Sequence, residues 1–457
     1  MTDVRELGLD CLTEILEKGR HSHVVLRQTL EAGRELPRRE RAFLTRLVEG
    51  TLERLYELDY LIDCFSRITT EKQKPFIRNL LRISVYQIKY MDSVPARAAV
   101  SEAVRLAGKR GFRSLQGFVN GVLRTIVREH AKVSYPRRED GFSQWARVVY
   151  SMPVWITQEL LSEYGEERTE RMLSGGLSGR PFTVRCNLSR AGEEKIRESL
   201  SAQGIEARPV PEVPGVFTLT GFDRPEEIAA FQEGFLQVQD VSSVLAGLAA
   251  DIREGDFVLD ICAAPGGKSL HAADLLAGSG HVEARDLTEA KVSLIRENQE
   301  RSRFSNLSLR VWDARIPDEA MFGRADVVLA DLPCSGLGII GRKSDIKYKL
   351  TKSAQEELAA LQREILDASW RYVRPGGRLV FSTCTVFPSE NRENARWFAE
   401  NYPFVQVNLR EELPQRFFVG TENQETNDRE AGAGWLQLLP GEKGTDGFFI
   451  AAFRRTK

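Results

Sequence analysis

Residues 257–268 read FVLDICAAPGGK, an apolar run that breaks abruptly into a turn of small residues. The apolar residues up to Ile261 are typical of a strand that is covered on both faces. Gly266 and Gly267 would let the backbone approach a ligand closely, and the residues after them have helical spacing. We therefore expect a buried strand that leads into a ligand-binding loop, although an ordinary strand-to-helix turn would read the same.

A second strand-like segment, HVEARD, ends in Asp286. In nucleotide-binding folds, a carboxylate about twenty residues beyond the first glycine turn binds the ribose hydroxyls. The loop itself is neither a Walker A sequence nor G-x-G-x-x-G. The spacing predicts a nucleotide-like ligand with its tail at the first loop and its ribose at Asp286, and the alternative is a chance acid downstream of a common turn.

The chain of 457 residues is too long for one core, so we expect two or three domains. Its sequence has no apolar run that could span a bilayer and no signal peptide at MTDVRELGLD, which favours a soluble protein of the cytoplasm. Six cysteines are scattered without a C-x-x-C pair. This pattern argues against a zinc site and a disulfide framework, and it predicts reduced thiols and no metal.

The net charge of −1 conceals an asymmetry along the chain. Residues 1–150 contain 27 Lys and Arg against 19 Asp and Glu, a net charge of +8, so the other 307 residues carry −9. A basic N-terminal part indicates a polyanionic partner such as a nucleic acid. The alternative is the ordinary solvated face of a helical protein.

Residues 1–140 have apolar side chains at helical spacing, which predicts an all-α bundle with helices at 76–90, 97–107 and 115–127. Nothing in this region suggests chemistry, so it would bind RNA or a protein partner, or serve as a structural cap. A polar stretch at 130–144 is the expected linker. Residues 150–235 read as a small α+β module that grips substrate or acts as a spacer.

Residues 236–457 alternate regularly between strands and helices, which predicts an open α/β sheet of parallel strands with ligands at their carboxyl ends. The expected strands are 257–261, 281–284, 307–311, 325–330, 378–382 and 447–453. The residues at their ends are Cys262, Ala263, Ala264, Pro265, Gly266, Gly267, Lys268, Asp286, Asp313, Asp331, Cys334 and Cys384. Such a gathering predicts a functional site.

The motifs CAAPGGK, VWDA, DLPCSGLG and STCT resemble those of RNA cytosine-C5 methyltransferases that use S-adenosylmethionine. RERAFLTRLVEGTLER and VNGVLR resemble the RNA-binding NusB antitermination domain. Together they are similar to the bacterial enzymes of the Sun or Fmu (RsmB) type, and this resemblance covers nearly the whole chain. It implies a Rossmann-like catalytic domain that methylates C5 of a cytosine in 16S ribosomal RNA, at position 967 in that family.

The chemistry of this reaction explains why two strand ends should carry cysteines. Cytosine C5 is a poor nucleophile until a thiolate adds at C6. By the family pattern Cys384 is that nucleophile, and Cys334 assists its release. Two buried structural cysteines are the alternative, and Cys262 is expected to serve in packing or in contacts of the cofactor with the backbone.

The resemblance also implies the cofactor contacts. The loop from Cys262 to Lys268 would hold the methionine part, Asp286 the ribose and Asp313 the adenine amino edge. Asp331 would stabilise the base, the cofactor or both. The implied partner is RNA, most specifically 16S ribosomal RNA, and we expect a monomer.

Several alternatives stay open at this point. The target could be another RNA, or the protein could be a non-catalytic RNA-binding or antitermination scaffold. A DNA cytosine methyltransferase would place its nucleophile in the proline-cysteine motif, whereas DLPC does not fit an amino-group methyltransferase. The basic residues Arg342, Lys343, Lys347 and Lys349 could meet RNA phosphates or form a solvated cluster. The polar run 421–434 is expected to be a loop before a final hairpin.

Overall fold

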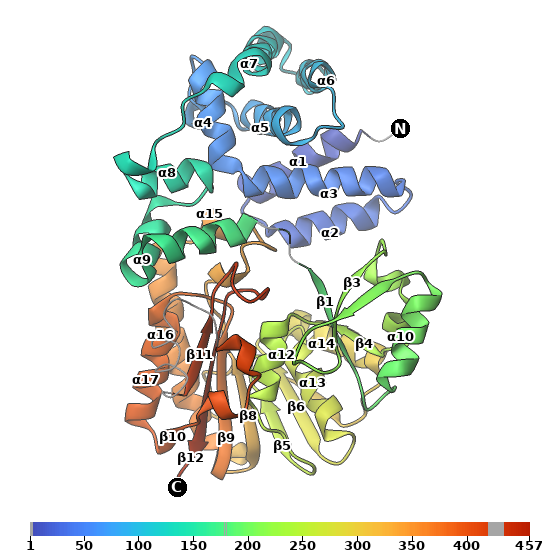
Figure 1. The fold of residues 1–457 in the computed structure, drawn as a ribbon, viewed down its shortest axis with the longest axis vertical. Helices are drawn as coiled ribbons and strands as arrows, with labels where there is room; N and C mark the ends of the chain where they lie inside the picture. Colours follow the sequence, from blue (N-terminus) through green and yellow to red (C-terminus); the bar gives the residue numbers. More distant parts are fainter. Residues whose placement is uncertain (1–2, 178, 180, 419–433) are drawn as a thin grey trace. The chain divides into compact units, whose positions relative to one another are not determined.

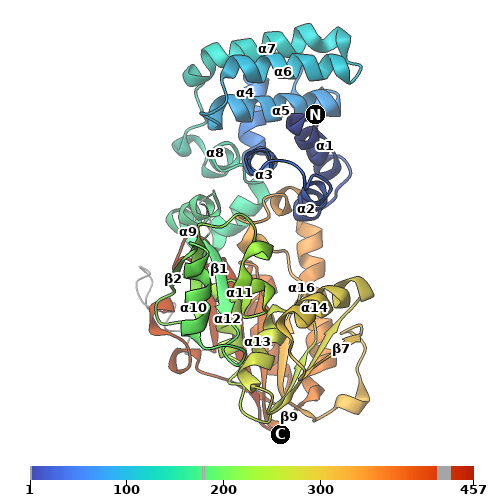
Figure 2. The same cartoon turned by 90° about the vertical axis from the view of Figure 1, so that its right-hand side faces the viewer.

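The computed structural model describes residues 3–177, 179, 181–418 and 434–457. The chain divides into two compact units. Unit 1 contains residues 1–177 together with the short segment 342–349, and unit 2 contains residues 178–341 and 350–457. Figures 1 and 2 show the ribbon of both from two directions.

Unit 1 is all-helical, as the apolar spacing predicted. Its main helices are α1 (Val4–Leu16), α2 (Ser22–Ala32), α3 (Arg38–Glu53), α4 (Leu55–Phe65), α5 (Pro75–Tyr90), α6 (Ala96–Lys109), α7 (Gln116–Glu129), α8 (Phe142–Val149) and α9 (Val154–Leu177). One continuous core of leucine, isoleucine and valine side chains joins α1 to α7. The three helices predicted at 76–90, 97–107 and 115–127 are confirmed as α5, α6 and α7.

Two prolines fix where helices of unit 1 begin. Pro75 is the first residue of α5, and Pro95 directly precedes α6. Proline suits these positions because its fixed φ matches the helix and its missing N–H would have no intrahelical partner there. The helix α6 that begins after Pro95 lies side by side with α7 (Figure 2), and the two helices make close contact.

The segment 342–349 interrupts unit 2 along the chain and packs as part of unit 1. It contains the short helix α15 (Ile346–Lys349). The side-chain nitrogen of Lys347 is buried and donates to the backbone carbonyls of Glu53 and Tyr150, at 3.1 and 3.2 Å. Asp345 accepts from the amide and the hydroxyl of Ser22.

The first part of unit 2 is a small antiparallel sheet with the strand order β2-β3-β1-β4. Its elements are β1 (Phe182–Cys186), α10 (Glu193–Ala202), β2 (Glu206–Pro209), β3 (Val216–Thr220), α11 (Ala229–Gln232) and β4 (Leu236–Val238). The α+β character predicted for this module is confirmed. The short strands β2 and β4 escaped the sequence reading, because EARP is polar and LQV has only three residues.

The second part of unit 2 is a larger sheet of eight strands, in the order β10-β12-β9-β8-β5-β6-β7 with β11 paired to β12. The strands are β5 (Phe257–Asp260), β6 (His281–Asp286), β7 (Leu307–Val311), β8 (Ala325–Asp331), β9 (Val373–Thr383), β10 (Phe404–Gln406), β11 (Trp435–Leu438) and β12 (Phe448–Arg455). The strands from β5 to β9 are parallel. The prediction of parallel strands was wrong for β12, which runs antiparallel to β9 because the chain reverses its direction between β11 and β12.

Helices cover both faces of this sheet. The helices α12 (Val241–Leu248), α13 (Gly267–Leu276) and α14 (Glu289–Ser302) lie on one face, and α16 (Lys352–Ser369) and α17 (Arg392–Asn401) lie on the other (Figure 1). Val258 and Leu259 of β5 point into these two separate cores, as alternation along a strand requires. Burial on both faces explains the unbroken apolar run at the start of FVLDICAAPGGK.

The final hairpin predicted after the polar run is β11 paired with β12. The run itself, 421–434, lies outside the described residues except for its last glycine. Within the described part of the chain, no helix has the length and apolar character needed to cross a membrane.

Candidate active site

The carboxyl ends of β5, β6, β7, β8 and β9 meet along one edge of the larger sheet, because these strands are parallel. Asp286 ends β6, Asp331 ends β8, and Cys384 directly follows β9. The strand order reverses between β5 and β8, so the CAAPGGK loop and Asp331 flank the switch point at which open α/β sheets bind ligands.

The CAAPGGK loop connects β5 to α13 and is held by its own backbone. The amide of Gly266 donates to the carbonyl of Ala263 at 2.7 Å, and Gly266 has a φ of +104°, which only glycine adopts readily. The amide of Ala264 donates to the Asp286 carboxylate at 2.9 Å. Asp286 is therefore connected to the loop by a direct hydrogen bond as well as by its place at the sheet edge.

Lys268 and Asp331 form an ion pair across this edge. The Lys268 ammonium lies 2.6 Å from one Asp331 oxygen, and the Ser382 hydroxyl donates to the other at 2.7 Å. The lysine side chain is only 9% exposed, whereas that of Asp331 is 32% exposed. The carboxylate is thus fixed by the protein and still accessible from the edge.

Asp313 has a looser environment, two residues beyond β7. Its carboxylate is half-buried and pairs with Arg315 on the same loop at 2.6 Å. Hydrogen bonding to Arg315 lowers the pKa of Asp313, which keeps it ionised. It shares the sheet edge with the other candidate residues, but no interaction connects it to them within the described residues.

Cys334 and Cys384 come from loops that are 50 residues apart in the sequence, yet their sulfur atoms are 3.3 Å apart. Both side chains are half-buried. The loops are joined a second time, because the hydroxyls of Ser335 and Thr385 are 2.6 Å apart. The amide of Gly338 also donates to the carbonyl of Cys384 at 2.9 Å.

The surroundings of Cys334 disfavour its ionised form. The hydrogen bond with Cys384, burial, and the nearby carboxyl groups of Glu390 and Asp331 raise the pKa of Cys334 well above its ordinary value. Each of these factors disfavours a thiolate at Cys334. A Cys334 thiol with a raised pKa keeps its proton at neutral pH, and its S–H lies within hydrogen-bonding distance of the Cys384 sulfur.

Cys262 is separate from this pair. It lies at the start of the CAAPGGK loop and packs against the core under α16 and α17. Burial raises its pKa well above the ordinary value, with Asp286 and Asp260 adding to the effect. A thiol in this environment is inert, in agreement with a packing role.

Three family descriptions match the sequence. They are "16S rRNA methyltransferase RsmB/F" over residues 248–454, "NusB family" over 2–128, and "Methyltr_RsmF/B-like, ferredoxin-like domain" over 152–223. The "Probable ribosomal RNA small subunit methyltransferase B" of Bacillus subtilis is 35% identical over 99% of both chains. The chain belongs to the RsmB/F family of 16S rRNA methyltransferases.

A second relative and two solved structures are also similar to this chain. The "Probable ribosomal RNA small subunit methyltransferase B" of Synechocystis is 28% identical over 100% of both chains. The crystal structure of PH0851 is similar in fold over 100% of this chain and 99% of its own, with a TM-score of 0.80 and 24% identity. A methyltransferase homologue from Pyrococcus horikoshii covers 66% of this chain and 95% of its own, with a TM-score of 0.54 and 25% identity.

Members of the RsmB/F family are S-adenosylmethionine-dependent RNA methyltransferases, and the sheet edge of this methyltransferase fits that cofactor. Among the described residues, no side chain caps the N-terminus of α13, so the first amides of this helix are available to a carboxylate. A Cβ atom on Gly267 would meet nothing closer than Gln239 at 3.9 Å, so the loop leaves space at this point. Asp286 supplies a buried carboxylate of the kind that binds ribose hydroxyls.

Two buried carboxyl groups of the methyltransferase escaped the sequence reading. Asp260 ends β5 and accepts from the Ser269 hydroxyl at 2.6 Å, and burial raises its pKa to about 7. Glu390 follows the Cys384 motif and accepts from the amide of Ser335 at 2.7 Å. Asp260 lies inside the quoted FVLDICAAPGGK motif and could have been found there, whereas nothing in the sequence singles out Glu390.

The basic residues after the proline-cysteine motif differ from expectation. Lys347 is buried in unit 1, and Lys349 pairs with Asp345 at 2.7 Å and donates to the carbonyl of Arg20 at 2.6 Å. The hypotheses of RNA contact and of a solvated cluster are therefore both wrong for Lys347. It is a structural residue that anchors 342–349 in the helical unit.

Proposed function

We propose that this protein transfers a methyl group from S-adenosylmethionine to C5 of a cytosine in 16S ribosomal RNA, through a covalent adduct between Cys384 and C6 of the base. The observation that carries the proposal is the 3.3 Å approach of the Cys334 and Cys384 sulfur atoms at the edge that also holds the CAAPGGK loop. Two structural cysteines have no reason to meet at a sheet edge that is built for a ligand.

Cys384 serves as the nucleophile in this proposal. Addition of its thiolate to C6 turns the base into an enamine whose C5 attacks an electrophilic methyl group. S-adenosylmethionine, when bound, supplies that methyl group. The Cys334 thiol, whose sulfur lies 3.3 Å away, supports the Cys384 thiolate by donating a hydrogen bond to it.

Cys334 acts in the second half of the reaction. After methyl transfer, a base such as a water molecule takes the C5 proton, the electron pair of the C5–H bond re-forms the C5–C6 double bond, and the bond between C6 and the Cys384 sulfur breaks. The Cys334 thiol, 3.3 Å away, donates a hydrogen bond to the departing sulfur. The alternative, with the nucleophile in the proline-cysteine motif as in DNA cytosine methyltransferases, would exchange the roles of Cys334 and Cys384.

Asp331 and Lys268 form the polar wall of the site. Their ion pair and the hydrogen bond from Ser382 fix the Asp331 carboxylate in one orientation. A carboxylate held in this way can accept from the amino group of a cytosine and so stabilise the adduct. We assign Asp331 this role, with contact to the cofactor as a second one.

For the cofactor, we assign the methionine part to the loop from Cys262 to Lys268 and the ribose to Asp286. Its adenine amino edge falls to Asp313. The support comes from the free amides at the start of α13, the hydrogen bond from Ala264 to Asp286, and the shared sheet edge. No residue in this assignment requires a metal ion.

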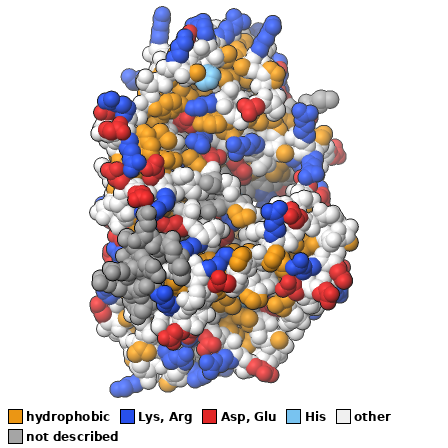
Figure 3. Space-filling model, in the orientation of Figure 1, with side chains coloured by type: hydrophobic (Ala, Val, Ile, Leu, Met, Phe, Trp, Pro, Cys, Tyr) orange, Lys and Arg blue, Asp and Glu red, His pale blue; other side chains and the backbone are white. Residues whose placement is uncertain are grey.

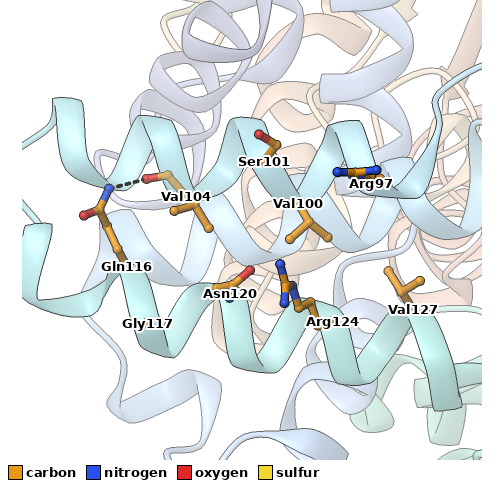
Figure 4. A pocket seen from close by; sticks show the side chains of 9 residues that line it. All are labelled: Arg97, Val100, Ser101, Val104, Gln116, Gly117, Asn120, Arg124 and Val127. Atoms are coloured by element: carbon orange, nitrogen blue, oxygen red, sulfur yellow. Dashed lines mark hydrogen bonds between the residues drawn. The ribbon is translucent and has the colours of Figure 1, made fainter.

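RNA capture falls to the helical residues 1–140, and catalysis to residues 236–457. Figure 3 shows Lys and Arg side chains at the end of unit 1 where α6 and α7 lie. A groove of about 730 Å³ runs between these helices, with Arg97 of α6 and Arg124 of α7 on its two walls (Figure 4). Both guanidinium groups are exposed and have no ion-pair partner in the described part of the chain, so they are available to RNA phosphates.

The ribosomal target follows from the names of the relatives, which are small-subunit ribosomal RNA methyltransferases. We further propose that the protein is a cytoplasmic monomer.

The proposed methylation is tested by incubation of the full chain with unmodified 16S ribosomal RNA and S-adenosylmethionine carrying a labelled methyl group, followed by mapping of the label. A single 5-methylcytosine is the expected product, whereas label in another RNA only, or on a base nitrogen, would contradict the proposal.

A further inference from the structure

Glu390 is a buried carboxyl group that contacts the loop of Cys334. It ends the turn Pro388–Glu390 that follows the Cys384 motif, and its side chain is fully shielded from solvent. One of its oxygens accepts from the amide of Ser335 at 2.7 Å, and the amide group of Gln362 lies 3.5 Å from the same oxygen. Ser335 is the residue next to Cys334, so Glu390 contacts the backbone of the Cys334 loop.

Gln362 of α16 extends this contact. Its amide nitrogen donates to the carbonyl of Pro333 at 3.0 Å, and its oxygen accepts from Asn394 of α17 at 2.8 Å. The residues on both sides of Cys334 are therefore tied to one group of buried side chains. The Cys334 loop is fixed by Glu390 on one side and by Gln362 on the other.

Asn391, the next residue, ties the other loop in the same way. Its side-chain oxygen accepts from the Thr383 hydroxyl at 2.5 Å, and its nitrogen donates to the carbonyl of Thr385 at 3.0 Å. Thr383 and Thr385 are the two neighbours of Cys384. Two adjacent residues, Glu390 and Asn391, thus hold the backbone on both sides of the place where the sulfur atoms meet.

Burial of the Glu390 carboxyl group has a cost in free energy that requires an explanation. Burial raises the pKa of Glu390 to about 7, which shows that the site disfavours the charged form. One Glu390 oxygen has no hydrogen-bond partner among the described residues. A buried acid with an unsatisfied oxygen is costly to the fold, so a benefit to function is the explanation to test.

We propose that Glu390 is a positioning residue of the two-cysteine site, which holds the Ser335 amide and so keeps the sulfur of Cys334 against that of Cys384. Without this acceptor the Ser335 amide is left buried and unpaired, and the Cys334 loop moves to find another partner. The expected effect of Glu390 on catalysis rests on the proposed function. The expected effect of Glu390 on the distance between the sulfur atoms does not depend on that function.

The distance between the two thiols can be measured without RNA or cofactor. Diamide takes up two electrons and two protons while the thiols of Cys334 and Cys384 join as a disulfide, which peptide mapping identifies. Because two thiols react quickly only when they are held together, we expect Glu390→Ala to slow this bond by about tenfold or more. Glu390→Gln retains an acceptor oxygen at the same place and should stay within about threefold of the unchanged protein.

Glu412→Gln is the matched control. Glu412 pairs with Arg378 in the middle of β9 at 2.7 Å, so its loss also removes a carboxylate contact of unit 2 but touches neither cysteine loop. It should leave the disulfide rate unchanged. If Glu390→Ala does not fold, Glu390→Asp replaces it, because aspartate keeps the charge but its side chain is one methylene shorter. A rate for Glu390→Ala or Glu390→Asp equal to that of the unchanged protein would overturn the proposal.

Catalysis provides the second measurement. A displaced Cys334 should impair elimination, so Glu390→Ala should lower kcat with little change in KM for RNA and accumulate a covalent RNA complex that survives denaturing electrophoresis. Glu390→Gln should show neither effect. Loss of activity that matches only the loss of folded protein would contradict a positioning role. If the disulfide rate falls but no cysteine variant forms or loses an adduct, Glu390 positions the thiols and the proposed covalent chemistry is wrong.

Discussion

Cys334 and Cys384 have neighbouring sulfur atoms, and the surroundings of Cys334 act on its proton. The hydrogen bond with Cys384, burial and the nearby carboxyl groups of Glu390 and Asp331 raise the pKa of Cys334. A thiol with a raised pKa is a poor nucleophile and a weak acid, but its S–H can donate a hydrogen bond to a neighbouring sulfur. The proposal of separate roles for the two cysteines therefore has a direct test.

Replacement of each cysteine by alanine should have opposite effects on the covalent complex. Cys384→Ala should lower methylation by at least about a thousandfold and abolish the adduct, since no enamine can form. In Cys334→Ala, Cys384 should still add to the base and C5 should still be methylated, but the RNA should be released slowly. This variant should therefore accumulate a covalent complex of enzyme and methylated RNA. Denaturing gels with substrate RNA and cofactor measure both effects.

Cys186→Ala is the control for this experiment, because Cys186 is buried in β1 of the small sheet and should affect only stability. An adduct formed by Cys384→Ala would show that the nucleophile is Cys334. Loss of folded protein with near-normal turnover in the remainder would show that Cys384 is structural.

At the scale of elements, the loop after β5 combines two glycines with different demands. A Cβ on Gly266 would come within 3.0 Å of the Ile295 side chain, at a φ of +104° that side chains rarely adopt. Gly266→Val should therefore lower the free energy of unfolding by about 1–3 kcal/mol. Gly267 has an open surrounding within the protein, so Gly267→Val should keep its melting temperature and lose affinity for S-adenosylmethionine.

Calorimetry and melting curves separate the two glycine variants. Gly278→Val serves as the control for backbone strain, because Gly278 has a φ of +85° with no atom within 4 Å and lies outside the loop. It should be less stable and bind the cofactor normally. Unchanged cofactor affinity in Gly267→Val would remove this loop from the cofactor site.

The sequence predicted the elements that bury apolar side chains on a regular period. The strands β5 to β9 and the residues at their ends follow from apolar runs that stop at Asp286, Asp331 and Cys384. The direction of β12 could not be predicted, because an apolar strand reads the same in a parallel or an antiparallel place. The burial of Lys347 could not be predicted either, because its partners are backbone carbonyls of Glu53 and Tyr150, which any sequence supplies.

The buried Lys347 should make the stability of unit 1 depend on pH. Burial lowers its pKa to about 7 in the folded protein, while the unfolded value is about 10.4. The unfolded state therefore binds more protons between these values, so the stability due to Lys347 is full above pH 10 and is lost as the pH falls toward 7. We compare the free energy of unfolding of the unchanged protein with that of Lys347→Met. As the pH falls from about 10 to about 7, we expect the difference between them to shrink by a few kcal/mol, which is the order of magnitude that this shift of the Lys347 pKa allows.

Chemical denaturation at pH 7 and pH 9.5 measures that difference. Lys349→Met is the matched control, since Lys349 is paired and more exposed in the same short helix and should show little dependence. A difference that is constant between the two pH values would mean that Lys347 is charged in the folded protein.

At the scale of the whole molecule, the chain divides its charge between its parts. The basic excess lies in residues 1–150 and the acidic excess in the remainder, which includes the proposed catalytic residues. A phosphate backbone is attracted to the first part and repelled by the average charge of the second. The helical unit should therefore contribute most of the salt-dependent part of the affinity for RNA. The C-terminal part should recognise the single target base.

The groove between α6 and α7 allows this division to be tested in the full chain. Each phosphate contact releases counterions and contributes about 0.7 to 0.9 to the slope of log affinity against log salt concentration. If Arg97 and Arg124 each contact one phosphate, Arg97→Ala with Arg124→Ala should flatten that slope by about 1.5 and leave kcat at saturating RNA unchanged. Arg105→Ala is the control on the same helix, because Arg105 is already paired with Glu102 and Asp3 and should leave the slope unaltered. Filter binding across a salt series gives the slopes, and an unchanged slope in the double variant would show that this groove does not hold the RNA backbone.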